Sequence, residues 1–222
     1  EVISGLNEYA GNVELNKFGG RFKYSKLNTL IDRVDNGITS NITKIIIRRD
    51  MKALLNQFAQ YELCFGNQFN INPAGFNIKS TGFTISGSNE IAYITDVPNK
   101  DAAGNLDGSM KGTLSVVFKN EKNEQRVLIK EAGIVDYKKG EVIMNTINIT
   151  STTTQNNIVE IQAFPESNDI VGLKDLYLSF DVSKSTINMF KDVIASGEDV
   201  SGVVFTRDYY TSSYSNGDLE RK

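Results

Sequence analysis

The residues of this chain that could do chemistry are carboxylates and one thiol, because the sequence contains no histidine. Its 222 residues include 27 Asp and Glu, one cysteine, no histidine and no tryptophan. Without histidine, Ser-His-Asp and Cys-His catalysis are excluded, and most zinc sites are excluded as well. A pair of carboxylates can still hydrolyse a glycosidic bond. No local pattern singles out one pair, so the sequence predicts no catalytic residue.

The single thiol, Cys64, lies between Leu63 and Phe65 in a segment typical of a strand. One cysteine cannot form an internal disulfide, so the fold must rest on its own core. A nucleophilic cysteine needs a base nearby, and the usual base is missing. We therefore predict that Cys64 is a small buried hydrophobic residue and not a reactive thiol.

The acidic, glycine-rich segment 99–111 does not match the sequence pattern of an EF-hand calcium loop. With Gly108 at the sixth position of an EF-hand loop, Asp107 falls at the fifth position and Ala103 at the first. The twelfth position, which requires glutamate, is Leu114. We expect a long hairpin connection without a metal ion, and its alternative role is that of a contact loop.

Composition favours a folded soluble protein that binds neither nucleic acid nor a membrane. The net charge is −3, with 40% hydrophobic and 23% charged residues, and no basic block suits a nucleic-acid backbone. No apolar run approaches the roughly 20 residues of a membrane-spanning helix, and no signal peptide opens the chain. Because it begins with Glu1, we expect a fragment or a processed product. Four basic residues could pair with acidic neighbours, although the default expectation for each is a solvated surface charge: Arg48, Arg49, Lys138 and Lys139.

Residues 1–72 are predicted to form a small α+β unit. Ser25 can cap a helix whose apolar residues recur at helical spacing, and Gly37 can end that helix in a left-handed conformation. The segment 41–49 alternates like a strand, and a second strand is expected at 61–65 after a short helical turn at 51–58. The face of the first strand predicted to be buried carries Thr43, Ile45 and Ile47.

Residues 73–165 are predicted to form an antiparallel β domain. Short alternating segments separated by turns recur at regular spacing, which is typical of an antiparallel sheet, a sandwich or a small barrel. Lys138, Lys139 and Gly140 are expected to make the turn of a hairpin. The predicted strands lie on both sides of residues 80–82 and at 90–97, 112–119, 125–131, 134–150 and 157–164.

Residues 166–222 are predicted to be a C-terminal strand-helix segment with a polar tail. A strand is expected at 175–181, followed by a helix that Ser183 or Ser185 caps and Gly197 ends. One face of this helix, which either packs in the core or is presented to a partner, carries Ile187, Phe190 and Ile194. The tail 206–222 contains Tyr209, Tyr210 and Tyr214, which suit docking on a neighbour. The predicted fold class is therefore α+β and strand-rich.

Four ordered segments carry a resemblance to a known family: GGRFKYSKLNTLIDRVDNGITSNITKIIIRRD, YELCFGNQF, GIVDYKKGEVIMN and SNDIVGLKDLYLSFD. Together they resemble the C-terminal portion of gene product six, the large baseplate wedge protein of T4-like contractile-tailed phages. The resemblance extends from about Gly19 to Phe205. It is weakest at residues 67–112 and in the tail.

This resemblance implies a structural role without a catalytic residue, metal or cofactor. The family's wedge protein self-associates and joins adjacent wedges into a ring around the hub, and it contacts other baseplate wedge proteins. By this resemblance the chain is a late protein and not an enzyme. It would be assembled in the host cytoplasm and located in the tail baseplate of the virion.

Two alternatives from other functional classes stay open. A carboxylate-based cell-wall glycosidase would need a cleft with two carboxylates about 5–10 Å apart, and the absence of tryptophan weighs against sugar stacking. A tail-associated carbohydrate- or receptor-binding module would bind host cells. An assembly subunit would instead bind itself or other tail proteins.

Overall fold

The computed structural model describes residues 1–120, 122, 124–190, 214–215 and 218–219. The chain divides into two compact units, Glu1–Ser185 and Thr186–Lys222. In the second unit, β14 (Tyr214–Ser215) pairs antiparallel with β15 (Asp218–Leu219). Across the described residues, neither helix combines the length and the hydrophobicity that crossing a lipid bilayer requires.

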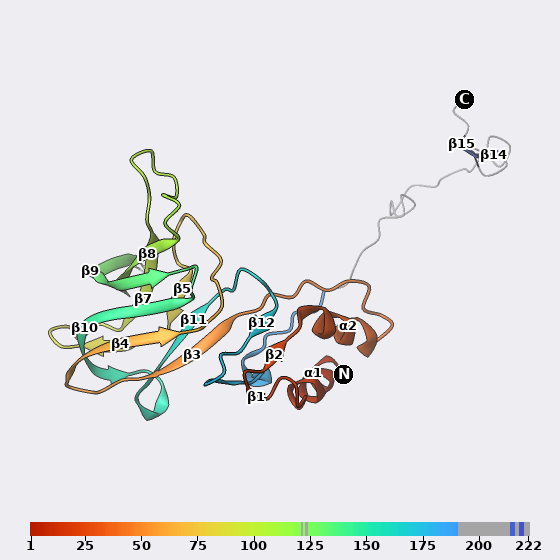
Figure 1. Ribbon diagram of the computed structural model, residues 1–222, viewed down its shortest axis with the longest axis horizontal. Helices are drawn as coiled ribbons and strands as arrows, with labels where there is room; N and C mark the ends of the chain where they lie inside the picture. Colours follow the sequence, from red (N-terminus) through yellow and green to blue (C-terminus); the bar gives the residue numbers. More distant parts are fainter. Residues whose placement is uncertain (121, 123, 191–213, 216–217, 220–222) are drawn as a thin grey trace. The chain divides into compact units, whose positions relative to one another are not determined.

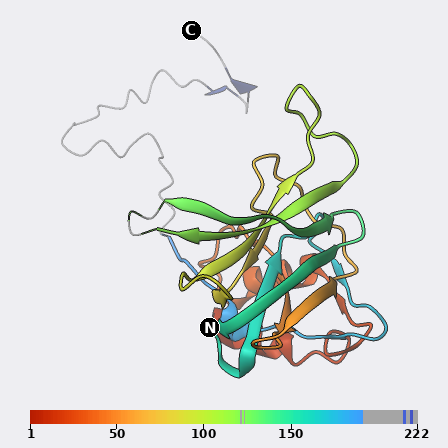
Figure 2. The same cartoon turned by 90° about the vertical axis from the view of Figure 1, so that its left-hand side faces the viewer.

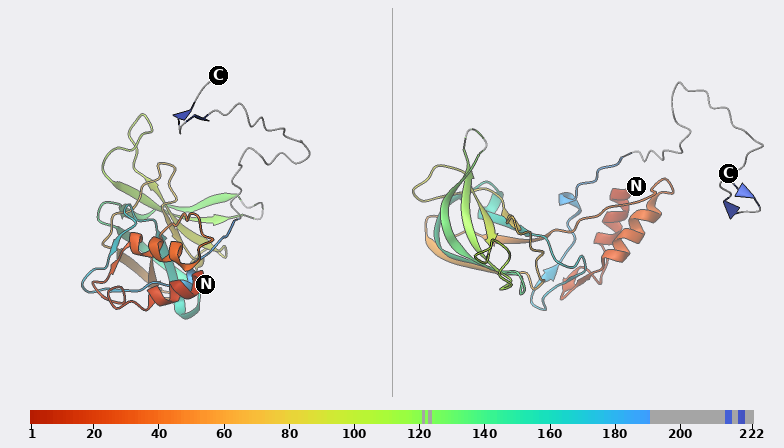
Figure 3. Two further views of the ribbon diagram at one scale, coloured as in Figure 1. Left: turned by 90° about the vertical axis from the view of Figure 1, so that its right-hand side faces the viewer. Right: turned by 90° about the horizontal axis from the view of Figure 1, so that it is seen from above.

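The first unit begins with two helices, α1 (Val2–Ala10) and α2 (Tyr24–Val34), which lie side by side (Figure 3). Two short strands lie between these helices in the sequence, β1 (Lys17–Phe18) and β2 (Arg21–Phe22). They pair with β13 (Tyr177–Leu178) and β12 (Ile170–Val171), so the two ends of the unit fold together. The core of this helical region consists of Leu6, Tyr9, Leu15, Phe22, Leu27 and Ile170.

The helix predicted between the caps Ser25 and Gly37 is confirmed as α2, but both predicted caps are wrong. The helix begins at Tyr24, and its N-cap is Lys23, two residues before the predicted cap Ser25; Lys23 makes no side-chain capping bond. Beyond its end, the carboxylate of Asp35 accepts from the backbone N–H of Gly37 at 2.6 Å. Since Asp35 supplies this acceptor, the chain turns without the left-handed glycine that we expected at Gly37.

The predicted strand at 41–49 is shorter and shifted in the structure. β3 spans Ile47–Lys52, and residues 41–46 are outside regular structure. The predicted alternation of burial is present, because Thr43 and Ile45 are half-buried whereas their neighbours are exposed. A strand also needs a partner for its backbone groups, and the pairing of β3 with β11 (Ile158–Ala163) ends at Ile47. The predicted helical turn at 51–58 is wrong, because this segment holds the end of β3, a turn and the start of β4 (Phe58–Cys64).

The largest sheet curls into a barrel. Its strand order is β4-β10-β6-β7-β8-β9, and an additional pairing between β10 and β9 closes five strands into an antiparallel barrel. The barrel lies at the left of Figure 1 and faces the viewer in Figure 2. β11 also pairs with β5 in a three-stranded sheet of order β3-β11-β5. The remaining strands are β5 (Ile78–Ser80), β6 (Phe83–Ile85), β7 (Ala92–Pro98), β8 (Lys111–Lys119), β9 (Gln125–Asp136) and β10 (Glu141–Thr152).

The predicted α+β fold class with a C-terminal strand-helix segment is therefore wrong. The dominant element is an antiparallel barrel, and the strand expected at 175–181 is reduced to the two residues of β13. In place of the expected helix start, Val182–Lys184 makes one 3₁₀ turn, in which the Asp181 carboxylate accepts from the N–H of Ser183. Residues 186–190 are not helical, and the rest of the predicted helix lies outside the described residues, as does most of the predicted tail. The boundaries predicted at residues 72 and 165 stay a prediction.

One buried carboxylate connects two barrel strands to the start of β5 in the three-stranded sheet. Asp96, on β7, is 1% exposed. Its Oδ1 accepts from the backbone N–H of Ile78 at 2.7 Å, and its Oδ2 accepts from the Asn77 amide at 2.8 Å. The Tyr137 hydroxyl, at the end of β9, also donates to Oδ2. A buried carboxylate without such donors would strongly destabilise the fold, so these three bonds are a condition for the closed barrel.

Burial raises the pKa of the Tyr137 hydroxyl, and the adjacent Asp96 carboxylate raises it further. The unfolded chain ionises this tyrosine near pH 10. Its stabilising effect is therefore fully present below that pH and is lost progressively as the pH rises above it toward the higher pKa of the folded state. We expect Tyr137→Phe to lower the free energy of unfolding by about 1–3 kcal/mol at pH 7. Above pH 10, the difference in the free energy of unfolding between Tyr137→Phe and the wild type should become smaller, as measured by urea unfolding. Tyr93→Phe on β7 is the matched control, and an equal loss in both variants would contradict the assignment.

The hairpin turn between β9 and β10 is confirmed, and Gly140 holds it in a left-handed conformation with φ of 69°. A Cβ atom there would overlap the backbone carbonyl of Asn67. Gly87 has a similar φ of 87° and open space around it, so the two glycines separate backbone strain from collision. We expect Gly87→Ala to cost about 1–2 kcal/mol and Gly140→Ala about 3 kcal/mol or more in urea unfolding. Equal losses of stability in Gly87→Ala and Gly140→Ala would contradict this account, because they would show that the contact with Asn67 does not destabilise the protein.

Candidate functional site

Cys64 is half-buried on β4, with two carboxylates next to its sulfur. Its Sγ lies 3.8 Å from Oε1 of Glu62 and 3.9 Å from Oε1 of Glu141. Burial raises the pKa of the thiol, and the negative charges of Glu141 and Glu62 raise it further. A thiolate is therefore disfavoured here, which is the opposite of what a catalytic cysteine requires.

Glu62 and Glu141 are the carboxylates that the strand pairing brings together at this point, since Cys64 lies directly opposite Glu141. Glu141 also forms an ion pair with Lys139, at 3.6 Å. Neither glutamate lines the two pockets of the helical region. The two glutamates flank the Cys64 thiol on paired strands.

The segment 99–111 connects β7 to β8 as the predicted hairpin connection, with Pro98 opposite Gly112. Its carboxylates bond to the loop's own backbone. Asp101 accepts from the N–H groups of Ala103 and Asn105, both at 2.9 Å, and Asp107 accepts from the N–H of Ser109 at 2.8 Å. Among the described residues, no group of three or more acidic or cysteine side chains could hold a metal ion.

Arg48 takes part in a network of ion pairs, although we expected a solvated charge. Its guanidinium lies 3.2 Å from Asp50 and 3.3 Å from Asp181. It also lies 3.7 Å from Glu160, which pairs with Lys184 at 3.1 Å. The network connects β3 and β11 to residues 181–184, so it holds the last segment of the first unit against the three-stranded sheet.

A row of apolar side chains is exposed on the outside of the barrel. Val97 lies opposite Thr113, Thr113 lies opposite Ile134, and Ile134 lies opposite Ile143. The three aliphatic side chains are 49%, 52% and 40% exposed along this line. Residues paired in this way point to the same face of a sheet. The row Val97–Ile134–Ile143 therefore runs across β7, β8, β9 and β10 on one face, with Thr113 on β8 as its polar member.

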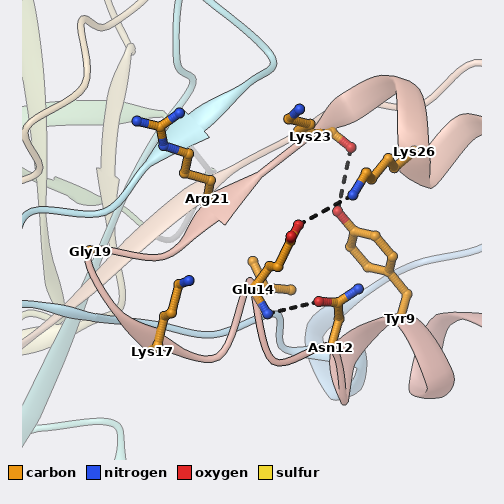
Figure 4. A pocket seen from close by; sticks show the side chains of 9 residues that line it. Tyr9, Asn12, Glu14, Lys17, Gly19, Arg21, Lys23 and Lys26 are labelled. Carbon is orange, nitrogen blue, oxygen red and sulfur yellow. Dashed lines mark hydrogen bonds and ion pairs between the residues drawn. The ribbon is translucent and has the colours of Figure 1, made fainter.

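The helical region contains a pocket of about 250 Å³ whose rim is strongly basic (Figure 4). It is lined by Tyr9, Asn12, Glu14, Leu15, Lys17, Gly19, Arg21, Lys23 and Lys26. We call this feature the basic pocket. Tyr9 and Leu15 are buried, whereas the charged residues are exposed. The basic pocket thus combines an apolar floor with four cations.

The basic side chains form an arc around a single carboxylate, that of Glu14 (Figure 4). Lys26 Nζ lies 3.3 Å from Glu14 Oε2, and this bond lowers the pKa of Glu14, with smaller contributions from Lys17 and Lys23. The Tyr9 hydroxyl donates to the carbonyl of Lys23 at 3.4 Å, and the Glu14 N–H donates to Asn12 Oδ1 at 2.8 Å.

Sequence reasoning missed the basic pocket. The available signal was four basic residues within ten positions, from Lys17 to Lys26. It was not used because these residues do not form a continuous block. Their convergence depends on the turn between β1 and β2 and on the first turn of α2, which bring separated positions to one hollow.

Comparison with known families connects this part of the chain to a phage structural protein. Residues 1–50 match the family model of the baseplate structural protein gp6, C-terminal domain III. The predicted resemblance to a gp6-like baseplate protein is confirmed over this segment, which contains the whole basic pocket. A search of curated proteins found no match. The match supports a structural role in a phage baseplate, and hence a place in the virion tail among other baseplate components.

The surroundings of Cys64 predict a slow thiol. Removing a negative charge about 4 Å from the sulfur by Glu141→Gln should lower the thiol pKa. Alkylation by iodoacetamide at pH 7.5 should then be about two- to fivefold faster. Glu131→Gln, on the neighbouring strand β9, is the matched control and should leave the rate unchanged. A rate for the wild type equal to that of a free cysteine, or no change on Glu141→Gln, would contradict this account.

Proposed function

We propose that this chain is a subunit of a contractile phage tail baseplate that associates with itself and joins adjacent wedges into a ring around the hub. The match of residues 1–50 to gp6 C-terminal domain III is the observation that carries the baseplate role. Self-association and ring joining go further than this match. Expression as a late protein, assembly in the host cytoplasm and the absence of catalysis belong to the same proposal.

The exposed apolar row supports self-association. Interfaces between proteins have an apolar centre from which charged residues are depleted. Val97, Ile134 and Ile143 supply such a centre on a rigid barrel, and Glu62 lies opposite Ile143 at one end of it. A stable interface buries roughly 800 Å² on each partner, so the contact must extend beyond the row onto the polar surface around it.

Self-association predicts a mass that depends on concentration. In light scattering coupled to size exclusion, the mass should rise from 24.6 kDa toward a dimer or larger species as the concentration increases. Ile134→Glu should weaken the association about tenfold or more, because it places a charge at the centre of the contact. Val127→Glu is the matched control on the same strand, where the native side chain is 58% exposed.

Two outcomes would count against this proposal. A strict monomer at the highest concentration would contradict self-association by this chain. Association of Ile134→Glu that equals the wild type, or an equal loss in Val127→Glu, would remove the apolar row as the contact.

A further inference from the structure

The basic pocket carries a surplus of positive charge for which the described residues offer no partner. Four basic side chains line it against one carboxylate, so three positive charges are in excess on a chain whose net charge is −3. Glu14 pairs with Lys26, and among the described residues Lys17, Arg21 and Lys23 form no ion pair. Three exposed cations around one hollow repel one another, and an anion bound among them would relieve this repulsion.

We propose that the basic pocket binds an acidic segment of another protein, with a carboxylate placed among Lys17, Arg21 and Lys23. That this protein is another tail component rests on the function proposed above. The binding of an acidic segment does not rest on it, because it follows from the charge and shape of the basic pocket.

The chemistry inside the basic pocket favours a carboxylate. Glu14 already occupies part of the arc, and Lys26 contacts it directly. This contact shows that a lysine of the basic pocket can pair with a glutamate side chain, and the positive charges of Lys17 and Lys23 also lower the pKa of Glu14. An acidic residue from a partner would meet the remaining cations in the same way, and Arg21 adds a planar donor that can bind both carboxylate oxygens.

The size and floor of the basic pocket favour a peptide over a small ligand or a nucleic acid. At about 250 Å³, the hollow is smaller than the roughly 300–1,000 Å³ of small-molecule sites, and it suits one or two side chains. The buried Tyr9 and Leu15 offer apolar surface to a residue next to the acidic one. A nucleic acid would instead need a long basic track, and the net charge of the chain opposes it.

Fluorescence anisotropy with a fluorescein-labelled octapeptide that alternates glutamate and leucine tests this proposal. The matched probe has glutamine in place of each glutamate. The acidic probe should bind the purified chain, and the glutamine probe should bind about tenfold more weakly or worse. Binding of the acidic probe should also weaken as salt increases from 50 to 300 mM, because exposed charges are screened.

Two triple variants locate the binding. Lys17→Gln, Arg21→Gln and Lys23→Gln together should weaken the acidic probe about tenfold or more. Lys44→Gln, Lys52→Gln and Lys119→Gln together make the same change in net charge at exposed positions outside the basic pocket. This control variant should bind nearly as the wild type does, since only a general electrostatic effect would weaken both variants equally.

The remaining outcomes decide against the proposal. Equal binding of the two probes, or an equal loss in the two triple variants, would overturn it. Displacement of the acidic probe by inorganic phosphate or single-stranded DNA at lower concentrations than by unlabelled acidic peptide would assign the basic pocket to phosphate ligands. Because Ile134→Glu lies on the barrel, it should bind the acidic probe as the wild type does, so a failure of self-association would leave this result unaffected.

Discussion

The closed barrel depends on the buried carboxylate of Asp96. Its two oxygens accept from the backbone N–H of Ile78, the amide of Asn77 and the hydroxyl of Tyr137, so Asp96 joins β7 to the segment 77–78 and to the residue that follows β9. The Asp96 carbonyl also accepts from the N–H of Phe76 at 3.2 Å. A carboxylate in an apolar interior is stable only when its lone pairs are occupied. The network therefore favours one arrangement of β7, the end of β9 and the segment before β5. The same arrangement fixes the strand register that aligns Val97, which follows Asp96, with Ile134 and Ile143.

A second constraint joins the barrel to the helical region. Ile47 packs against the barrel core and against the core beneath α1 and α2. Ile47 is the first residue of β3. It follows residues 41–46, whose burial alternates but which are outside regular structure. The ion pairs Arg48–Asp181 and Lys184–Glu160 hold residues 181–184 against β3 and β11. The apolar row and the basic pocket thus lie on two regions of one compact unit, and each region can make its own contact in an assembly.

Local patterns predicted the elements whose residues are close in sequence. The apolar spacing in 24–34 identified α2, and the turn at Lys138 to Gly140 identified the β9–β10 hairpin. Closure of the barrel was one of three alternatives, because the pairing of β10 with β6 joins residues more than sixty positions apart. The helix α1 was missed, since Gly5 weakens its local signal although it allows the close approach of Leu30 and Val34. Where a helix capped by Ser183 or Ser185 was expected, the chain makes a single 3₁₀ turn, which Asp181 closes with its own side chain.

The functional surfaces were harder to predict than the elements that carry them. The row Val97–Ile134–Ile143 exists only in one strand register, and the basic pocket exists only when β1, β2 and α2 meet. Neither the strand register nor the meeting of β1, β2 and α2 can be derived from composition or from the spacing of residues in the sequence. The resemblance was more informative about function, and the match of residues 1–50 confirms it for the region that holds the basic pocket.

Methyl NMR of the isoleucine side chains at increasing protein concentration tests the central claim most directly. If the barrel row is the contact between copies, the signals of Ile134 and Ile143 should shift and broaden with concentration. The signal of Ile42, which is 93% exposed outside the row, should stay constant. Constant signals for Ile134 and Ile143, or larger changes at Ile42, would contradict the account of this barrel as an assembly surface.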